Sequence, residues 1–267
     1  MTPARIAELL EPFLCAPLTP PTPPTDCHSE PAKAGEEPAV LSAAQLQDIS
    51  TYIDILVRWN ARINLTAIRD PEDIVPRHFG ESLFAARHLF SGASLGKGSS
   101  GRAALQGRVA GHARARALAP EAVANDQRLS TDDSLADLGS GAGFPGLPIK
   151  LWAPTIALTL IESNHKKAAF LREVTRALTF TDVNIQNARA ETLTATFDVV
   201  TLRAVEHFET ILPIAAALLA PAGRLALLIA AAQQAQARAL LPHLTWSAPA
   251  PIPTSRSRIL LIARSAS

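Results

Sequence analysis

One segment of the chain reads Ser134-Leu-Ala-Asp137-Leu-Gly139-Ser140-Gly141-Ala-Gly143-Phe144-Pro145-Gly146-Leu-Pro148. It is a short apolar run that ends on an acid and then passes through three glycines in alternate positions. Glycine tolerates the backbone angles of a tight turn and lets a ligand lie directly against the backbone. The segment therefore predicts a buried strand, a ligand-binding turn and the first turn of a helix.

Two acidic residues indicate the kind of ligand. Asp137 ends the first apolar run, and Glu162 follows the next one, at 155–161. A Rossmann-like fold places an acid roughly twenty residues after its glycines, where it binds ribose hydroxyls. A carboxylate at Asp137 would repel a phosphate on the turn. The pattern therefore favours S-adenosylmethionine, which carries an amino group and a sulfonium, over a nicotinamide dinucleotide.

The rest of the chain from 132 to 267 alternates apolar strands with helices. An amphipathic helix is expected over 163–174, and another helix over 211–219. Further strands are expected at 183–187, 197–202, 224–229 and 258–263, the last antiparallel and paired near 244–247. This order predicts a mostly parallel sheet with helices on both faces and a ligand at the carboxyl ends of its strands. The residues predicted at those ends are Asp137, Glu162, Arg189 and Arg203.

Three segments precede this Rossmann-like domain. Residues 1–38 are Pro-rich and are predicted to be a disordered tail with one short helix around 6–14. Residues 39–90 predict a helical subdomain, because Ser42 and Gln45 form a capping-box pattern and Pro71 suits the first position of a second helix. Residues 91–131, rich in Gly, Ala, Ser and Arg, are predicted to be a flexible basic insertion.

The length, composition and net charge of the chain exclude several classes of protein. The 267 residues are 48% hydrophobic and carry a formal net charge of +1, so any nucleic-acid surface must be a local patch. No apolar run is long enough to cross a bilayer. The two cysteines, Cys15 and Cys27, have no metal-ligand spacing. We expect a cytoplasmic protein without a bound metal, and a monomer.

Several short motifs together resemble one known family. They are Trp59-Asn60, Asn64-Leu65-Thr66, Arg77-His78-Phe79, 137–146, Glu162-Ser163, Lys166-Lys167, Phe170-Leu171, Arg189-Ala190-Glu191 and Arg203-Ala204. They resemble the RsmG family, also called GidB, which comprises bacterial 16S ribosomal RNA (guanine-N7) methyltransferases. The resemblance covers about residues 41–230, apart from the insertion. It implies a Rossmann-like class I S-adenosylmethionine-dependent methyltransferase fold with an N-terminal helical subdomain, and 16S ribosomal RNA or the small ribosomal subunit as partner.

The resemblance also implies roles for individual residues. Those implied to bind S-adenosylmethionine are Asp137, Gly139, Ser140, Gly141, Gly143, Phe144, Glu162, Ala190, Glu191 and Arg203, with Glu162 near the ribose and 190–191 near the adenine. Those implied to bind the RNA substrate are Lys166, Asn64 and His78. Arg203 and Arg189 are the candidate catalytic residues at the cleft between cofactor and RNA.

The chemistry needs no general base. Guanine N7 has an in-plane lone pair that can attack the sulfonium methyl directly, so the enzyme has to orient the base and exclude water. Arginine recognises the O6/N7 edge of guanine and also binds phosphate. We expect Arg203 to position the base or a phosphate, and Arg189 to shape the side of the cleft.

Besides the insertion, which is foreign to the compact family members, the chain departs from the family pattern at two places. Glu81 stands where the family commonly has Asp, and Ala230-Ala231-Ala232 stands where members usually carry Lys-Gly. Alternatives therefore stay open: a class I methyltransferase for another RNA, a protein or a small molecule, or a non-catalytic S-adenosylmethionine-binding protein. A nicotinamide dehydrogenase is disfavoured because Tyr52, the only tyrosine, lies on the N-terminal helix without a plausible Tyr-Lys pair.

Overall fold

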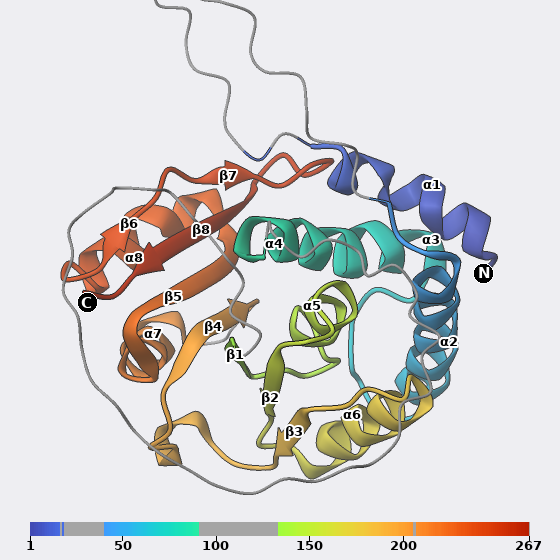
Figure 1. The fold of residues 1–267 in the computed structure, drawn as a ribbon, viewed down its shortest axis with the longest axis horizontal. Helices are drawn as coiled ribbons and strands as arrows, with labels where there is room; N and C mark the ends of the chain where they lie inside the picture. The colour runs from blue at the N-terminus through green and yellow to red at the C-terminus, as the bar shows by residue number, and fades with distance from the viewer. Residues whose placement is uncertain (17, 19–39, 91–132, 205–206, 267) are drawn as a thin grey trace, which may run out of the picture.

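The computed structural model describes residues 1–16, 18, 40–90, 133–204 and 207–266. The predicted disordered stretch at 19–38 and the predicted insertion at 91–131 therefore lie outside the described residues. The described chain forms one mixed sheet in the order β3-β2-β1-β4-β5-β8-β6, with β7 also paired to β8. Figure 1 shows the N-terminus beside α1 and the C-terminus beside β6 and β8.

The first five strands are parallel, and the last three run antiparallel to their neighbours. The parallel strands are β1 (Ser134–Leu138), β2 (Ala157–Ile161), β3 (Val183–Gln186), β4 (Phe197–Arg203) and β5 (Leu219–Ala230). The antiparallel strands are β6 (Thr245–Trp246), β7 (Ala250–Pro251) and β8 (Arg258–Arg264). The predicted Rossmann-like sheet and the pairing of the last strand near 244–247 are confirmed.

Strand β5 begins earlier than the sequence predicts. The ladder with β4 opens with Phe197 beside Leu219 and then shifts register, so that Val199 lies beside Arg224. The Pro-Ala-Gly turn at 221–223 was expected to separate a helix from the strand. It lies instead inside a bulged strand, because a bulge accommodates extra residues without ending the ladder.

Helices cover both faces of the sheet, as predicted. Alternate strand residues point to opposite faces, so Leu135 packs in one hydrophobic cluster and Ala136 in the other. On the first face lie α5 (Gly146–Trp152), α6 (His165–Ala177) and the N-terminal helices; on the second lie α7 (Phe208–Ala217) and α8 (Gln234–Leu240). In Figure 1, α4 and α5 occupy the centre of the view, and α2 and α6 lie beside one another.

The N-terminal helices follow the start and stop signals of the sequence. They are α1 (Pro3–Leu14), α2 (Ala43–Asn60), α3 (Pro71–Ile74), the π-helix η1 (Val75–Gly80) and α4 (Glu81–Leu89). The predicted capping box is confirmed: Gln45 N donates to Ser42 Oγ, and Ser42 N donates to Gln45 Oε1. Asp70 caps α3 by accepting from Glu72 N at 3.0 Å, with Pro71 at the first helical position.

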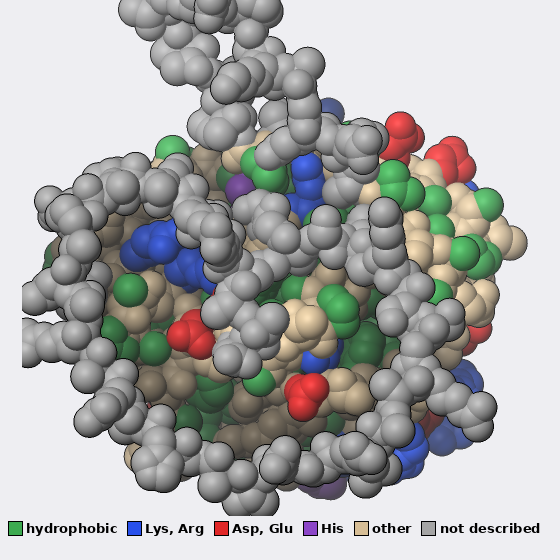
Figure 2. All heavy atoms as spheres, viewed as in Figure 1, with side chains coloured by type: hydrophobic (Ala, Val, Ile, Leu, Met, Phe, Trp, Pro, Cys, Tyr) green, Lys and Arg blue, Asp and Glu red, His purple; other side chains and the backbone are tan. Residues whose placement is uncertain are grey.

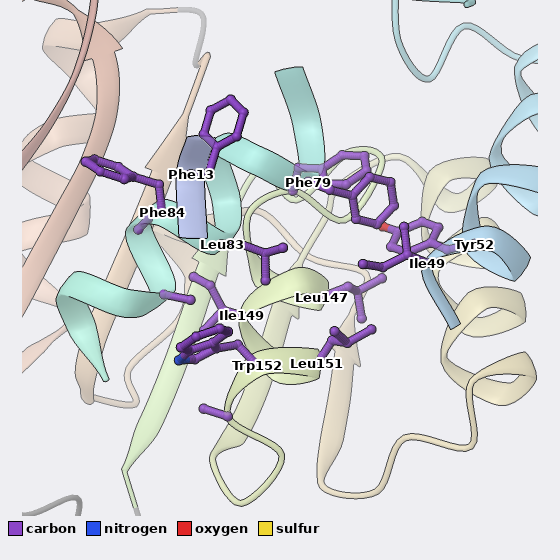
Figure 3. Packing of buried hydrophobic residues seen from close by; sticks show 14 of the residues in the cluster. Phe13, Ile49, Tyr52, Phe79, Leu83, Phe84, Leu147, Ile149, Leu151 and Trp152 are labelled. Atoms are coloured by element: carbon purple, nitrogen blue, oxygen red, sulfur yellow. The ribbon is translucent and has the colours of Figure 1, made fainter. Parts of the chain in front are cut away.

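The short helix expected around 6–14 is present as α1, which starts earlier, at Pro3. Its Ile6, Leu10 and Phe13 are buried in the core, a packing that was not predicted. The Phe13 ring packs so closely on Gly80 that a Cβ there would lie 2.5 Å from a ring carbon. Apolar residues at helical spacing and a Thr2 cap hold this helix, and Figure 3 shows Phe13 in the core beside Phe84.

The π-helix η1 was not predicted. Segments α3, η1 and α4 follow one another without a break, and the wider turn of η1 carries Arg77 and His78. Single-turn π segments inside helices are rare and often occur at functional sites. Here the segment presents the His78 ring and the backbone oxygen of Arg77 to Arg203 at the carboxyl edge of the sheet.

The described ranges lack two features, a membrane-spanning helix and a group of metal ligands. Among these residues, no helix combines the length and the apolar character needed to cross a membrane. Within the same part of the chain, no three His, Cys, Asp or Glu side chains are grouped so that they could hold a metal ion.

Candidate active site

The glycine-rich loop between β1 and α5 has the backbone angles that the sequence predicts. Gly139, Gly141 and Gly143 have φ values of +66°, +54° and +84°. The loop is joined to the neighbouring strand, because Gly139 N donates to Ile161 O at 2.9 Å. Ser140 is buried and its hydroxyl donates to Asp137 O at 2.8 Å.

Glu162 links this loop to the end of β2. Its Oε2 accepts from Gly141 N at 2.9 Å, and its Oε1 accepts from Asn164 N at 2.7 Å. Asn187, which the sequence analysis did not single out, donates to the backbone oxygens of Glu162 and Ser163. Each carboxylate oxygen has a second lone pair, so Glu162 can still accept hydrogen bonds from ribose hydroxyls.

Glu162 and Gly139 line a cleft of about 260 Å³ at the carboxyl ends of β1, β2 and β3. Its lining is Gly139, Ile161, Glu162, Ser163, Ala188, Arg189, Ala190, Glu191 and Ile211. Five residues singled out from the sequence thus lie together. A Cβ at Gly141 would have only Gly139 O nearby, at 3.7 Å, so open space adjoins the loop backbone. An open backbone beside an acidic side chain fits the ribose and the amino acid part of S-adenosylmethionine.

Asp137 lies beneath the loop and is fully buried. Its Oδ1 accepts from Thr201 Oγ1 at 2.9 Å, and its Oδ2 accepts from Gly146 N at 3.2 Å. Burial raises the pKa of Asp137 to about 7, although the hydrogen bonds from Thr201 and Gly146 oppose this shift. The Asp137 carboxyl therefore holds the start of α5 through the hydrogen bond from Gly146 N. Contact between Asp137 and a cationic part of the ligand stays a prediction.

Arg203 lies at the end of β4 in a group that we call the arginine cluster, namely Arg77, Arg203 and Arg258 around Glu81. Glu81 Oε2 lies 3.2 Å from Arg203 Nη2 and 3.1 Å from Arg258 Nη2, and Oε1 lies 3.7 Å from Arg77 Nε. Only 2% of the Glu81 side chain and 8% of the Arg203 side chain are exposed. Burial lowers the pKa of Arg203 to about 10, so it stays charged at neutral pH.

Three guanidinium groups and one carboxylate leave the arginine cluster with an excess of positive charge. The Nε groups of Arg203 and Arg258 are buried without a hydrogen-bond partner. Arg203 packs against η1, because its Nη2 donates to the backbone oxygen of Arg77. Arg189, and not Arg203, lines the cleft. On the face drawn in Figure 2, the visible Lys and Arg side chains of the described chain form separate groups, as the near-neutral net charge predicts.

His78 links the arginine cluster to the glycine-rich loop. Its Nδ1 lies 3.0 Å from Arg203 Nη1, its Nε2 lies 2.8 Å from Thr66 Oγ1, and its ring stacks on Phe144 at 4.7 Å. Because a guanidinium can only donate, Nδ1 accepts and Nε2 carries the proton. Burial, and then the charge of Arg203, lower the pKa of His78 to about 3.

A His78→Gln variant should show how this buried ring responds to pH. The unfolded chain binds a proton at His78 below about pH 6.5, whereas the folded chain does so only near pH 3. Stability from His78 is therefore present above pH 6.5 and is lost as pH falls. We expect the difference in unfolding free energy, wild type minus variant, to grow from pH 4 to 6.5 by at most about 1.4 kcal/mol per unit, and to be constant above pH 7.

Urea denaturation at a series of pH values measures this difference. Asp137 titrates in both proteins, so its contribution cancels in the subtraction. Gln can both donate and accept, so much of the hydrogen bonding at this position can be retained. A difference that is the same at pH 4 and pH 7 would show that His78 can be protonated in the folded protein.

The other predicted RNA-binding residues lie at the surface. Asn64 is exposed in the segment between α2 and α3, and Lys166 is exposed in the first turn of α6. The contacts of Tyr52 with the loop and of Thr201 with Asp137 were not predicted. A strand threonine and a helix tyrosine carry no local signal of such contacts.

Comparisons with known proteins support the resemblance seen in the sequence. Residues 45–98 and 120–248 match the family described as GidB, rRNA small subunit methyltransferase G; the unmatched residues 99–119 fall within the predicted insertion. A protein named ribosomal RNA small subunit methyltransferase G from Xylella fastidiosa (strain 9a5c) is 34% identical over 194 residues, 72% of each chain. One of the same name from Halorhodospira halophila (strain DSM 244 / SL1) is 36% identical over 186 residues, 69% of each chain. The predicted family is thus confirmed, and this chain belongs to the GidB family of ribosomal RNA small subunit methyltransferases.

Proposed function

We propose that this protein transfers a methyl group from S-adenosylmethionine to N7 of a guanine in 16S ribosomal RNA. The observation that carries the proposal is the cleft at the carboxyl ends of β1, β2 and β3, where Glu162 and the glycine-rich loop meet. Membership of the GidB family and the names of the relatives support the RNA substrate. We further propose that the protein works in the cytoplasm as a monomer without a metal.

The cofactor would lie in this cleft. Gly139 and Gly141 would approach the amino acid part, Glu162 would accept from the ribose hydroxyls, and 190–191 would lie near the adenine. When bound, S-adenosylmethionine supplies a methyl group on a sulfonium, which is already activated for transfer. The protein has to hold that methyl in line with the attacking nitrogen.

Orientation of the guanine would then determine the rate. N7 attacks with its own lone pair, so no side chain has to remove a proton. Arg189 at the rim of the cleft is suited to shape the side where RNA enters. The arginine cluster at the end of β4 has an excess of positive charge, and its most exposed member, Arg77, with 46% of its side chain exposed, is suited to hold a phosphate or the guanine O6.

Methyl transfer from labelled S-adenosylmethionine tests the proposal directly. Small-subunit particles and naked 16S ribosomal RNA would be incubated with the protein, and the labelled nucleoside would be identified after digestion. We expect N7-methylguanosine at a single position. Cofactor binding without transfer to either RNA would contradict the proposal and redirect the search to another substrate or to a non-catalytic role.

A Glu162→Gln variant should bind S-adenosylmethionine at least about tenfold more weakly. The substitution keeps the shape but removes the charge and turns one acceptor into a donor, and hydrogen bonds to charged groups contribute about 1.5–3 kcal/mol. Isothermal titration calorimetry measures the affinity. Glu191→Gln is the matched control, because Glu191 lines the same cleft but is proposed to contribute only backbone. Equal affinities for both variants would contradict the ribose role.

A further inference from the structure

Tyr52 contacts the glycine-rich loop and is not among the residues that line the cleft. It comes from the middle of α2, and its hydroxyl donates to Ala142 O at 2.5 Å, across 90 residues of sequence. Only 1% of Tyr52 is exposed. Figure 3 shows the Tyr52 ring pointing from α2 into the core, toward Phe79. The only tyrosine of the chain thus joins the helical subdomain to the predicted cofactor loop.

The contact is specific in both shape and chemistry. Tyr52 stacks on Phe144 with ring centroids 5.4 Å apart and planes 4° from parallel. His78 also stacks on Phe144, at 4.7 Å, and Phe79 meets it edge-on at 5.1 Å, so this ring of the loop contacts three aromatic groups of the helical subdomain. Burial, and then the charge of Asp137, raise the pKa of Tyr52, so its hydroxyl keeps the proton that it donates.

The glycine content of the loop explains why an external contact would stabilise one shape of its backbone. It contains three glycines with positive φ, and glycine loses more conformational freedom on folding than any other residue. Ala142 lies between two of them, so its carbonyl is where an external hydrogen bond can fix the orientation of a peptide plane. A loop that samples several shapes when empty binds its ligand less tightly, in proportion to the fraction that is competent.

We infer that Tyr52 is a positioning residue, which holds the glycine-rich loop in the shape that binds the cofactor. The inference rests on the proposed cofactor site, because its consequence is an effect on S-adenosylmethionine affinity. Tyr52 itself does not contact the cofactor. It acts through Ala142 and Phe144, so the helical subdomain contributes to cofactor binding without lining the cleft.

A Tyr52→Phe variant tests the inference, because it keeps the ring and its stacking and removes only the hydroxyl. One hydrogen bond contributes about 0.5–1.5 kcal/mol, so we expect a dissociation constant for S-adenosylmethionine roughly three- to tenfold higher. The rate of methyl transfer at saturating cofactor should change less than about twofold, because a filled loop regains its shape. Amide hydrogen exchange in the loop should be faster in the empty variant and should return to the wild-type rate with cofactor bound.

Trp59→Phe is the matched control. Trp59 also lies on α2, and its Nε1 donates to Glu173 Oε2 on α6 at 2.9 Å, away from the loop. This variant also loses one hydrogen bond between α2 and the sheet domain, so its melting temperature should fall while its cofactor affinity stays unchanged. The inference would be overturned if Tyr52→Phe lost stability like Trp59→Phe but kept wild-type affinity and loop exchange.

The two measurements separate this inference from the proposed function. Loop exchange in the empty protein tests the contact between Tyr52 and the loop without any ligand. If the wild type bound no S-adenosylmethionine, or if Glu162→Gln bound it normally, the proposed cofactor site would be wrong. Unchanged loop exchange in Tyr52→Phe would overturn the role of Tyr52 alone.

Discussion

A Glu81→Gln protein is expected to lose about 3–5 kcal/mol of unfolding free energy, which is the typical cost of leaving buried charges uncompensated. Glu81 contributes the carboxylate that the three guanidinium groups of the arginine cluster share. Gln has nearly the same shape, so the loss would come from charge rather than from packing. Burial, and then the charges of Arg258 and Arg77, already lower the pKa of Arg203, and without Glu81 the repulsion among the three arginines would be unopposed.

Urea denaturation at neutral pH measures the loss, and two variants serve as controls. Glu81→Asp keeps the charge and shortens the side chain, so it should lose less than half as much stability. Glu8→Gln breaks an exposed pair with Arg5, whose side chains are 66% and 41% exposed, and should cost less than about 1 kcal/mol. If Glu81→Gln were no less stable than Glu8→Gln, the arginine cluster would not depend on Glu81 for its neutralisation.

Gly143→Ala should give the largest effect in the loop itself. A Cβ at this position would overlap the Tyr52 hydroxyl and lie 2.6 Å from Leu147 Cδ1. The φ of +84° is also a conformation that side chains rarely adopt. Overpacking costs about 1–3 kcal/mol and a left-handed residue about 1–2 kcal/mol. We expect a loss of about 2–5 kcal/mol in the protein without cofactor.

Gly141→Ala is the comparison that separates crowding from backbone angle. Gly141 has a φ of +54°, but a Cβ there would meet only Gly139 O at an ordinary distance of 3.7 Å. Its loss should therefore be limited to about 1–2 kcal/mol from the backbone. Thermal or urea unfolding of both variants without cofactor makes the comparison. Equal losses would show that the contact with Tyr52 does not restrict the loop.

The features that were predicted correctly are encoded within short distances along the chain. The capping box at Ser42, the three positive φ angles of the loop and the buried face of α6 each depend on residues a few positions apart. The carboxyl edge of the sheet could also be predicted, because parallel strands end at the same edge. This is why Glu162 and Arg189 were expected to lie together.

The features that were missed depend on residues far apart in sequence. Arg258 meets Glu81 and Thr201 meets Asp137 only because the strands and α4 are packed in one particular way. The short helix α1 was expected from its own apolar pattern, but its burial depends on contacts with distant residues such as Gly80 and was not predicted. The π-helix depends on how α3 and α4 are joined and has no sequence signature of its own.

The position of β8 has a consequence for how the protein forms on the ribosome. This strand lies between β5 and β6, and its first residue, Arg258, is a neighbour of Glu81. During synthesis Arg77 emerges before Glu81, Arg203 much later and Arg258 last. Strands β6 and β7 also cannot pair until β8 has been made, because both pair with β8. The nascent chain therefore cannot complete the arginine cluster until residue 258 has been translated, and it cannot close the sheet until β8 has been made. The glycine-rich loop emerges long before.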